Sequence, residues 1–298
     1  MANLKEVRTR IASVSSTQQI TSAMKMVSAA KFRRAQNAIM GMRPYAAMMQ
    51  EIIADIDVED GVLTPYHEVR QPKNVLLVVV TSNKGLCGAF NSNVIKQASA
   101  CLSHYASLSP APTVKVISLG KRGSEFFAKQ EGLLLSSHDD LLDAATFDNV
   151  AELCEKIMTS FCNREYDVVE VVYNQFKNSL TQILSTEQML PVGNNEHKTE
   201  NGEQKPENGK RRNDYIFEPG KEQILREMIP MALRTNFYRM VLDSLASEHG
   251  ARMTAMQKAT DNATELLKEH KLSYNKARQA AITNEIIEIV SGSEALKG

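Results

Sequence analysis

Apolar residues near the N-terminus have the spacing of a long helix that pairs with another helix. They recur at intervals of three, four and three residues, the a and d spacing of a coiled-coil seam. These residues are Leu4, Val7, Ile11 and Val14. The pattern predicts a helix over about residues 4–57, which would be about 80 Å long at 1.5 Å per residue.

The seam changes after residue 14. Gln18 and Thr21 occupy the next two positions, at which apolar residues are expected. A stripe of Ile20, Met24 and Val27, displaced around the helix, lies among small residues that let a neighbouring helix approach closely. We therefore expect this displaced stripe to take over the packing.

The region from 221 to 290 is also helical in pattern. Between 231 and 290 there is no proline and only one glycine, Gly250. Intermittent apolar residues supply contacts along it: Met253, Met256, Leu266, Leu267, Leu272, Ile282, Ile286 and Ile289. Pro230 predicts a kink near its start and Gly292 predicts its end, while Gly41 and Pro44 predict a kink or break in the first helix.

Strands and helices alternate between these two regions. Residues 75–80 form a continuous apolar, β-branched run, which is typical of a strand buried on both faces. Further strands are predicted at 113–119, 167–173 and 181–191, with 214–217 as a candidate last strand. Helices are predicted at 92–107, 123–130 and 147–164. The alternation predicts βαβ units and a mostly parallel sheet.

These patterns divide the chain into an N-terminal helix and connector (1–72), a central domain (73–218) and a C-terminal helix (219–298). Within the central domain, residues 193–213 are polar and predict a solvated loop. Helices in compact domains average about 11–12 residues, so two helices this long need each other, or a partner, along most of their length. We predict an α/β fold in which the terminal helices form a long antiparallel coiled coil and a βαβ domain is inserted between them.

Charge is unevenly distributed along a chain whose formal net charge is zero. Between Met1 and Gln50 there are eight Lys and Arg residues against one acid, Glu6. This local excess predicts an acidic partner for the first helix. Nucleic acid is the alternative partner, since phosphate binding needs only Lys and Arg, but apolar residues among the cations and the neutral whole-chain charge argue against it.

The composition excludes several further classes of protein. The four cysteines, at 87, 101, 154 and 162, form no CxxC pair and have no matching histidine spacing. This argues against zinc and a disulfide framework, and fits a reducing compartment. The longest apolar run, 75–80, is far short of the roughly 20 residues that span a bilayer. The N-terminus enters a charged helix directly, with no export signal, so we predict no membrane insertion.

The turns after the first two predicted strands resemble no phosphate-binding motif. Residues 82–91, SNKGLCGAFN, contain neither the Walker A spacing nor GxGxxG, and residues 119–123, LGKRG, do not either. We interpret both as tight strand-to-helix turns and Cys87 as a packed thiol rather than a nucleophile. We predict no catalytic residue, cofactor or metal site in this chain.

Three long stretches resemble the gamma subunit of F-type ATP synthases: IASVSSTQQITSAMKMVSAAKFRRAQ, SNKGLCGAFN, and LASEHGARMTAMQKATDNATELLKEHKLSYNKARQAAITNEIIEIVSG. The resemblance covers nearly the whole chain. It implies a Rossmann-like central domain and a non-catalytic rotor shaft that couples ion flow through the c-ring to the catalytic beta subunits. The implied partners are three alpha and three beta subunits around the shaft, the epsilon subunit and the c-ring, at the cytoplasmic face of the inner membrane.

The resemblance also implies contact residues. Met24 and Lys25 match the stretch that faces acidic lever segments of the beta subunits, with Arg252 across from them on the C-terminal helix. Gln279, Thr283 and Glu285 match positions that contact a beta-subunit loop higher up the shaft. Two alternatives stay open: an enzyme with a helical dimerisation rod, and a basic coiled-coil scaffold that binds nucleic acid.

Overall fold

The computed structural model describes residues 4–60, 64–178, 181–192 and 220–295. Two long helices, α1 (Leu4–Asp60) and α5 (Lys221–Ala295), lie at the ends of the sequence. Between them, the residues that the structure describes form five strands and three further α-helices, with two short 3-10 helices, η1 (Pro65–His67) and η2 (Asp140–Leu142). The strands are β1 (Asn74–Val80), β2 (Thr113–Leu119), β3 (Leu134–Ser137), β4 (Val168–Phe176) and β5 (Gln182–Leu190). The helices are α2 (Phe90–Ala106), α3 (Lys121–Phe127) and α4 (Phe147–Cys162).

The chain forms two compact units. Unit 1 combines Met1–Ala30 with Arg252–Gly298, and unit 2 is Lys31–Ala251. Both long helices contribute to both units: unit 1 joins the first part of α1 to the last part of α5, and unit 2 is a continuous stretch that contains the rest of both helices and the sheet. The division predicted from the sequence, at 72/73 and 218/219, follows the order of the elements instead and stays a proposal about domains.

The sheet of unit 2 has the strand order β3-β2-β1-β4-β5. β1 pairs in parallel with β2 and β4, β2 pairs in parallel with β3, and β5 runs antiparallel to β4. In the central strand β1, Val78 lies opposite Ile117 on one side and Val171 on the other. The mostly parallel sheet confirms the fold class, and its central position explains why β1 is apolar on both faces.

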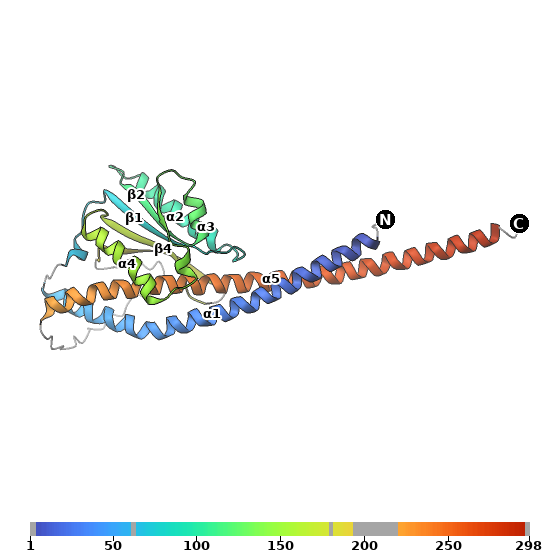
Figure 1. Cartoon of the computed structure of the whole chain (residues 1–298), viewed down its shortest axis with the longest axis horizontal. Coiled ribbons are helices and arrows are strands. Elements are labelled where there is room, and N and C mark those ends of the chain that lie inside the picture. The colour runs from blue at the N-terminus through green and yellow to red at the C-terminus, as the bar shows by residue number, and fades with distance from the viewer. Residues whose placement is uncertain (1–3, 61–63, 179–180, 193–219, 296–298) are drawn as a thin grey trace, which may run out of the picture. The chain divides into compact units, whose positions relative to one another are not determined.

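Helices cover both faces of this sheet (Figure 1). On one face Leu76 and Val80 of β1 join a core with α4 and α5 that includes Phe161 and Phe237. On the other face Leu77 and Val79 pack with side chains of α2 and α3. The alternation of β1 side chains between two separate cores is the arrangement expected for a strand with a period of two.

An ionic cluster also joins α5 to the sheet. The guanidinium of Arg239 donates to Glu187 on β5 at 2.9 Å and to Asp243 on its own helix at 3.1 Å. It also lies 3.4 Å from the Tyr173 hydroxyl, which donates to Glu187. Burial raises the pKa of Tyr173, so the phenol keeps its proton for this bond. The cluster places two carboxylates and one guanidinium where the sheet meets α5.

Glu170 of β4 is a second half-buried acid. Burial raises the pKa of Glu170, against the opposing effects of a hydrogen bond from Tyr105 and of His104. The proton is therefore bound more tightly in the folded chain than in the unfolded chain. Proton binding by Glu170 therefore contributes to the stability of the fold. This contribution is fully present below pH 4.5, the ordinary pKa of a glutamate, and is lost as the pH rises through the pKa of the folded chain.

We expect Glu170→Gln to raise the melting temperature at neutral pH and to lose this advantage at acid pH. The amide still accepts from Tyr105 but carries no buried charge. Glu152→Gln is the matched control with the opposite sign, because Lys156 lowers the pKa of the exposed Glu152. Thermal melts of the parent and both variants from acid to neutral pH check this. Equal melting temperatures of the parent and the Glu170 variant at neutral pH would show that the buried charge of Glu170 does not destabilise the fold.

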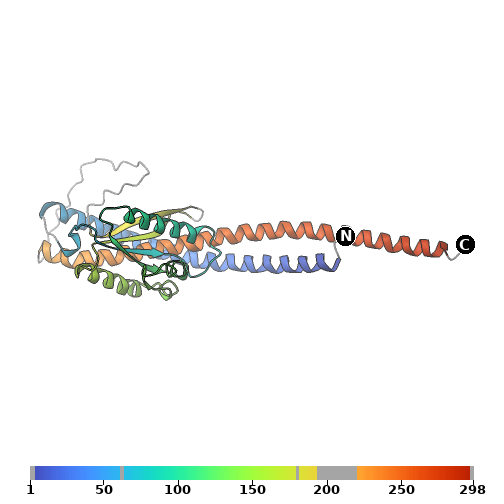
Figure 2. The same cartoon turned by 90° about the horizontal axis from the view of Figure 1, so that it is seen from above.

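In unit 1, segments of α1 and α5 run side by side in antiparallel directions, as the two views show (Figures 1 and 2). In both views α5 continues past the N-terminal end of α1. Every side chain of α5 from Arg278 to Ala295 is exposed. The predicted pairing of the terminal helices is therefore confirmed in unit 1, with an unpaired stretch of α5 beyond it.

Both long helices run through the residues that were predicted to interrupt them. A break at Gly41 and Pro44 is wrong, since α1 is continuous there, and the end predicted at Gly292 is wrong, since α5 continues to Ala295. Both prolines lie inside continuous helices, and the kinks predicted at Pro44 and Pro230 stay predictions. A proline removes only one helical hydrogen bond, and contacts between the helices hold the adjoining turns. Next to both prolines, the Tyr45 hydroxyl lies 3.3 Å from the Met231 sulfur.

The remaining predicted elements agree with the structure to within a few residues. Strand β3, at one edge of the sheet, and the two 3-10 helices were not predicted. The candidate strand at 214–217 and the polar loop at 193–213 lie outside the described residues.

Candidate interaction surface on the paired helices

In unit 1 the heptad spacing of the seam between the two helices continues without interruption, but the side chains that occupy it change from apolar to polar. Side chains with little exposure recur on α1 at intervals of three and four residues: Leu4, Val7, Ile11, Val14, Gln18, Thr21, Lys25 and Ser28. On α5 the corresponding series is Met256, Thr260, Ala263, Leu267, His270, Tyr274 and Ala277. The first half of the α1 series is apolar and the second half is polar, within one unbroken seam.

The predicted takeover of the packing by a displaced stripe is therefore wrong. Ile20, Met24 and Val27 are 58%, 40% and 59% exposed, although Thr21 beside them is buried. They follow one another at i, i+4 and i+7, so they share one face of α1. In this segment the polar side chains face the partner helix and the apolar ones face outward.

Cross-helix hydrogen bonds explain why polar residues are accepted in the seam. The Gln18 amide donates to Thr264 at 2.7 Å, and the Thr260 hydroxyl lies 2.9 Å from that of Thr21. The Thr21 hydroxyl also donates to the carbonyl of Gln18. Buried polar groups are tolerated where their hydrogen bonds are made, and polar seam residues fix the register of a coiled coil at a cost in stability.

We expect the double change Thr21→Val and Thr260→Val to leave the helix pair at least as stable, with a gain of up to about 2 kcal/mol. Both hydroxyls are removed together, so neither is left buried without its partner, and two methyl groups are buried instead. Hydrogen exchange of the full chain, followed in peptides from both helices, checks this. Faster exchange in the double variant would show that the hydroxyl pair is a net source of stability.

The same hydrogen bonds define the register and hence the place of Arg252. Three pairs join the helices: Arg8 with Tyr274 at 3.4 Å, and the two bonds that link Gln18 with Thr264 and Thr21 with Thr260. In each pair the residue numbers add to 281 or 282, so position 252 lies opposite about position 30. Arg252 is therefore about five residues, or 7–8 Å, along the seam from the position opposite Lys25. Arg252 thus lies about one and a half turns from the position opposite Lys25, and its role as a contact residue stays a prediction.

The predicted contact residues differ in how accessible they are. Met24 is exposed, whereas Lys25 lies half-buried in the seam and Arg252 is half-buried on α5. Gln279, Thr283 and Glu285 are all exposed on the unpaired stretch of α5. The hydroxyl of Thr283 donates to the carbonyl of Gln279 at 2.9 Å, so it is bonded within its own helix.

The unpaired stretch of α5 also carries an apolar face, formed by residues from which the sequence predicted intermittent contacts. Ile282, Ile286 and Ile289 are 48%, 56% and 67% exposed and share one face at i, i+4 and i+7. The three-and-four spacing placed these residues on one face. It did not indicate that α1 ends too early to cover these residues.

The two glycine turns of unit 2 have structural explanations. Gly120 has a positive φ of 106°, and a Cβ there would lie 2.6 Å from the carbonyl oxygen of Thr81, so only glycine fits. In the turn after β1 the Asn91 side chain accepts from the backbone N–H of Ser82 and donates to the sulfur of Cys87 at 3.2 Å. Cys87 is buried, which agrees with its interpretation as a packed thiol.

In the part of the chain that the structure describes, we find neither a metal-binding cluster nor a membrane-spanning helix. No group of three or more His, Cys, Asp or Glu residues there is placed to hold a metal ion. None of the described helices has the length and apolar character needed to cross a membrane.

Comparison with known proteins gives one consistent result. A family model described as ATP synthase matches residues 3–296. The chain is 52% identical over 300 residues to the ATP synthase gamma chain of Flavobacterium johnsoniae, and 44% identical over 303 residues to that of Bdellovibrio bacteriovorus. Each alignment covers 100% of both chains.

A solved structure shares the fold. The chain is similar, with a TM-score of 0.70 and 21% identity, to a chain in the cryo-EM structure of the Euglena gracilis mitochondrial ATP synthase titled OSCP/F1/c-ring, rotational state 3. The match covers 98% of this chain and 94% of that one.

Proposed function

The chain belongs to the ATP synthase gamma chain family, and we propose that its outward-facing side chains in unit 1 are the surface through which it acts on the catalytic subunits. As a gamma chain it is a non-catalytic subunit that forms the central rotor stalk of the enzyme. The observation that carries the proposal is the inverted pattern of α1, with polar side chains in the seam and Ile20, Met24 and Val27 outside it.

An exposed apolar face on a helix that is already paired calls for a further partner. Solvent-facing positions of a coiled coil are normally polar, and contiguous exposed apolar residues mark interaction sites. The same argument applies to the exposed face of α5 formed by Ile282, Ile286 and Ile289, because the described part of α1 does not extend along it. Because the two apolar faces lie on different helices, the surface offered to a surrounding ring is not the same on all sides.

This asymmetry is what a rotor needs. A shaft changes the affinity of a catalytic site only through contacts that differ between its rotational positions. Met24 would contact a beta-subunit lever through its exposed thioether. Lys25 and Arg252, each half-buried in unit 1, would add positive charge that attracts acidic lever segments.

We assign Gln279, Thr283 and Glu285 to a contact with a beta-subunit loop. All three are exposed on the unpaired stretch of α5, among the isoleucines. The further partners in this proposal are the alpha subunits, the epsilon subunit and the c-ring, at the cytoplasmic face of the inner membrane. The relatives support this placement through their identity as ATP synthase gamma chains.

The contact on α5 is tested by replacing Gln279, Thr283 and Glu285 together by alanine in the assembled enzyme. We expect ATP-driven proton transport by membrane vesicles to fall about fivefold or more, because polar contacts contribute about 1 kcal/mol each. Glu131→Ala, which changes an exposed acid of unit 2, is the control and should be silent. Unchanged transport by the triple variant would remove these residues from the proposal.

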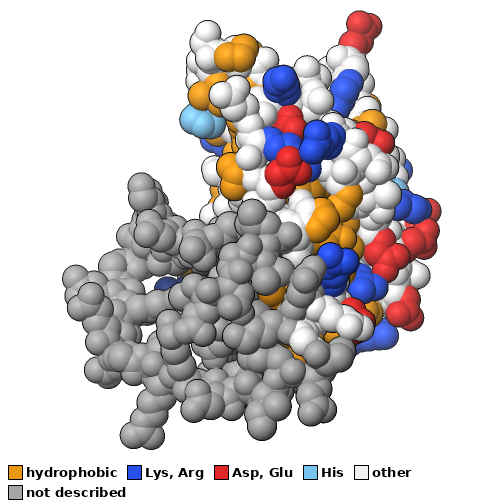
Figure 3. All heavy atoms as spheres, turned by 90° about the vertical axis from the view of Figure 1, so that its left-hand side faces the viewer, with side chains coloured by type: hydrophobic (Ala, Val, Ile, Leu, Met, Phe, Trp, Pro, Cys, Tyr) orange, Lys and Arg blue, Asp and Glu red, His pale blue; other side chains and the backbone are white. Residues whose placement is uncertain are grey.

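The alternative of a nucleic-acid scaffold has no support among the relatives, which are ATP synthase gamma chains. Figure 3 shows acidic and basic side chains next to one another on the described part of one end face, with apolar side chains between them. The described part of this one face therefore lacks the concentration of cations expected of a phosphate-binding surface.

A further inference from the structure

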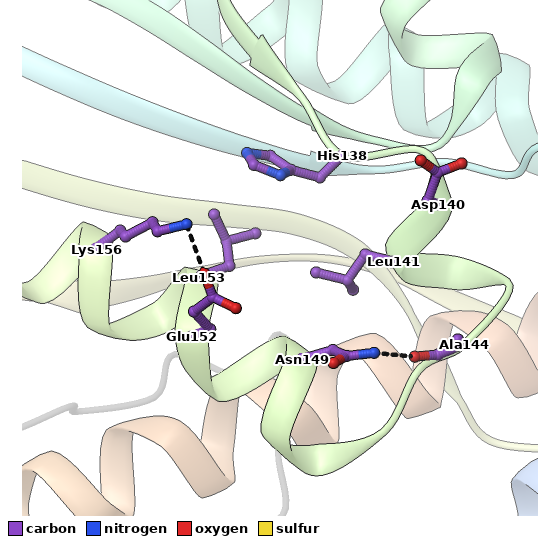
Figure 4. Close-up of a pocket in the computed structure, with 8 residues that line it drawn as sticks. All are labelled: His138, Asp140, Leu141, Ala144, Asn149, Glu152, Leu153 and Lys156. Carbon is purple, nitrogen blue, oxygen red and sulfur yellow. Dashed lines mark hydrogen bonds and ion pairs between the residues drawn. The ribbon is translucent and has the colours of Figure 1, made fainter.

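A hollow of about 310 Å³ lies between η2 and α4 in unit 2 (Figure 4). Polar groups on its lining are engaged within the chain: Lys156 pairs with Glu152 at 2.8 Å, and the Asn149 amide donates to the carbonyl of Ala144 at 3.0 Å. We therefore assign no ligand to this hollow. The polar seam of unit 1, by contrast, presents a choice between two packings of the same helices.

Two sets of side chains on α1 compete for the place that faces α5. One set is the apolar stripe formed by Ile20, Met24 and Val27, which faces outward. The other set faces α5, and each of its members follows a stripe residue by one position: Thr21, Lys25 and Ser28. One position is about 100° around a helix, so a turn of α1 by this angle would exchange the two sets.

The spacing of the sequence permits this turned packing. After Val14, the residues that would face α5 follow at steps of three, three, four and three: Thr17, Ile20, Met24 and Val27. An added step of three residues is a stammer, which overwinds a coiled coil locally. The Thr17 hydroxyl, which would enter the seam, already donates to the carbonyl of Ser13 at 3.0 Å. Its donor would therefore stay satisfied on burial.

Hydrophobic burial favours the turned packing. The three side chains of the stripe are 40–59% exposed, and removal of apolar area from water is the main favourable term in folding. On the facing side of α5, Ala259 is half-buried and Ala263 is buried, and such small side chains leave room for larger ones. The observed packing must therefore contain interactions that offset this gain.

The cross-helix hydrogen bonds provide that offset. The Gln18 amide donates to Thr264 at 2.7 Å, and the Thr21 and Thr260 hydroxyls are 2.9 Å apart. A turn of α1 by about 100° would carry Gln18 and Thr21 away from α5, so both contacts would be lost. The observed packing also continues the heptads of residues 4–14 without a change of phase.

We propose that four residues hold the apolar stripe outward: Gln18, Thr21, Thr260 and Thr264. Without their cross-helix contacts, α1 turns within residues 14–28 and buries the stripe against α5, which conceals it from any partner. Polar seam residues that select one packing of a coiled coil at a cost in stability act in this way. The choice of packing is a property of the helix pair itself, and only the use of the stripe as a contact surface rests on the proposed function.

Three methionines report which packing is present. Met24 belongs to the stripe and is 40% exposed, whereas Met26 is 66% exposed and lies about 200° around the helix from Met24. Met26 therefore stays exposed in both packings. Met256 is 5% exposed in the seam, so it reports any opening of the pair. Hydrogen peroxide oxidises exposed methionines to the sulfoxide, and peptide mass spectrometry of the isolated full chain gives the initial rate at each.

Thr260→Val combined with Thr264→Val removes the partners on α5 and leaves the Gln18 amide against an apolar surface. We expect the oxidation rate of Met24 relative to Met26 to fall about threefold or more, while Met256 stays protected. An unchanged ratio would overturn the proposal. Faster oxidation of Met256 would overturn it too, because the pair would then have opened instead of turned.

A rescue variant separates positioning from general damage to the pair. Gln18→Leu and Thr21→Val, added to the α5 changes, make the outward packing apolar throughout its seam and should restore the parental ratio. A ratio that stays low would contradict the proposal. Thr9→Val with Thr283→Val is the matched control, because both threonines are exposed and donate within their own helices. A fall in the control equal to that in the α5 variant would also overturn it. Because no other subunit is present, failure here is distinct from failure of the proposed contact surface.

Discussion

Replacing Ile20, Met24 and Val27 together by serine should leave the isolated chain as stable as the parent and should strongly impair its assembly with the catalytic subunits. The three side chains are 40–59% exposed, so the folded chain loses little buried apolar area. If partner subunits bury what is now exposed, each change removes about 1 kcal/mol of association free energy. Together they should lower the apparent affinity by about two orders of magnitude. Reconstitution of ATPase activity, titrated with each chain, measures this.

Three seam residues provide the matched control. Val7, Met256 and Leu267 are nearly buried between the helices, and their replacement by serine should destabilise the pair by several kcal/mol. The outward variant, with serine at 20, 24 and 27, should therefore assemble poorly but stay as stable as the parent. The seam variant, with serine at 7, 256 and 267, should be less stable than the parent as an isolated chain. If the outward variant melted earlier than the parent, or assembled normally, the stripe would not be a partner surface.

Arg239→Met should destabilise unit 2 by about 3–5 kcal/mol, the usual cost of removing one member of a buried ion pair. The change leaves Glu187 and Asp243 close to each other without the guanidinium that donates to both. It also removes a neighbour of the Tyr173 hydroxyl. Denaturant unfolding of the full chain, followed by near-ultraviolet circular dichroism of its tyrosines, measures the loss.

An exposed ion pair provides the comparison for Arg239. Arg122 pairs with Glu125 at 3.0 Å, and both side chains are about half exposed. Arg122→Met should therefore change the free energy of unfolding by less than about 1 kcal/mol. A similar loss in the two variants would mean that burial does not set the cost in the Arg239 cluster.

The central domain could be predicted from the sequence because its signals are local. The run that forms β1 is apolar on both faces, and only a strand covered on both sides accepts such a run. Strand β3 escaped prediction because its four residues, Leu134–Ser137, alternate between exposed and half-buried positions. So short an alternation is no stronger than the pattern of many loops.

The seam could not be predicted because its signal is divided between two helices. Taken alone, Gln18 and Thr21 are polar residues at apolar positions and indicate the end of a seam. Only the register places Thr264 and Thr260 opposite them, where their hydrogen bonds are completed. An apolar stripe displaced from a polar seam then belongs to a surface rather than to the core.

The candidate site shows the same division between local and non-local information. Spacing indicated that Ile282, Ile286 and Ile289 share one face, but only the register of the two helices shows that this face lies beyond the described part of α1 and is exposed. The family resemblance supplied Met24, Lys25, Arg252, Gln279, Thr283 and Glu285. No periodicity in the chain distinguishes Gln279 or Glu285 from an ordinary solvated helical face, so their role stays a proposal.

Native mass spectrometry of the complex purified through a tag on this chain tests most directly whether the paired helices serve as a shaft inside a ring of other subunits. The expected result is a single copy of this chain with three copies each of two larger subunits. A stable homodimer without those subunits would contradict it, because the exposed faces of α1 and α5 would then be covered by a second copy of the same chain.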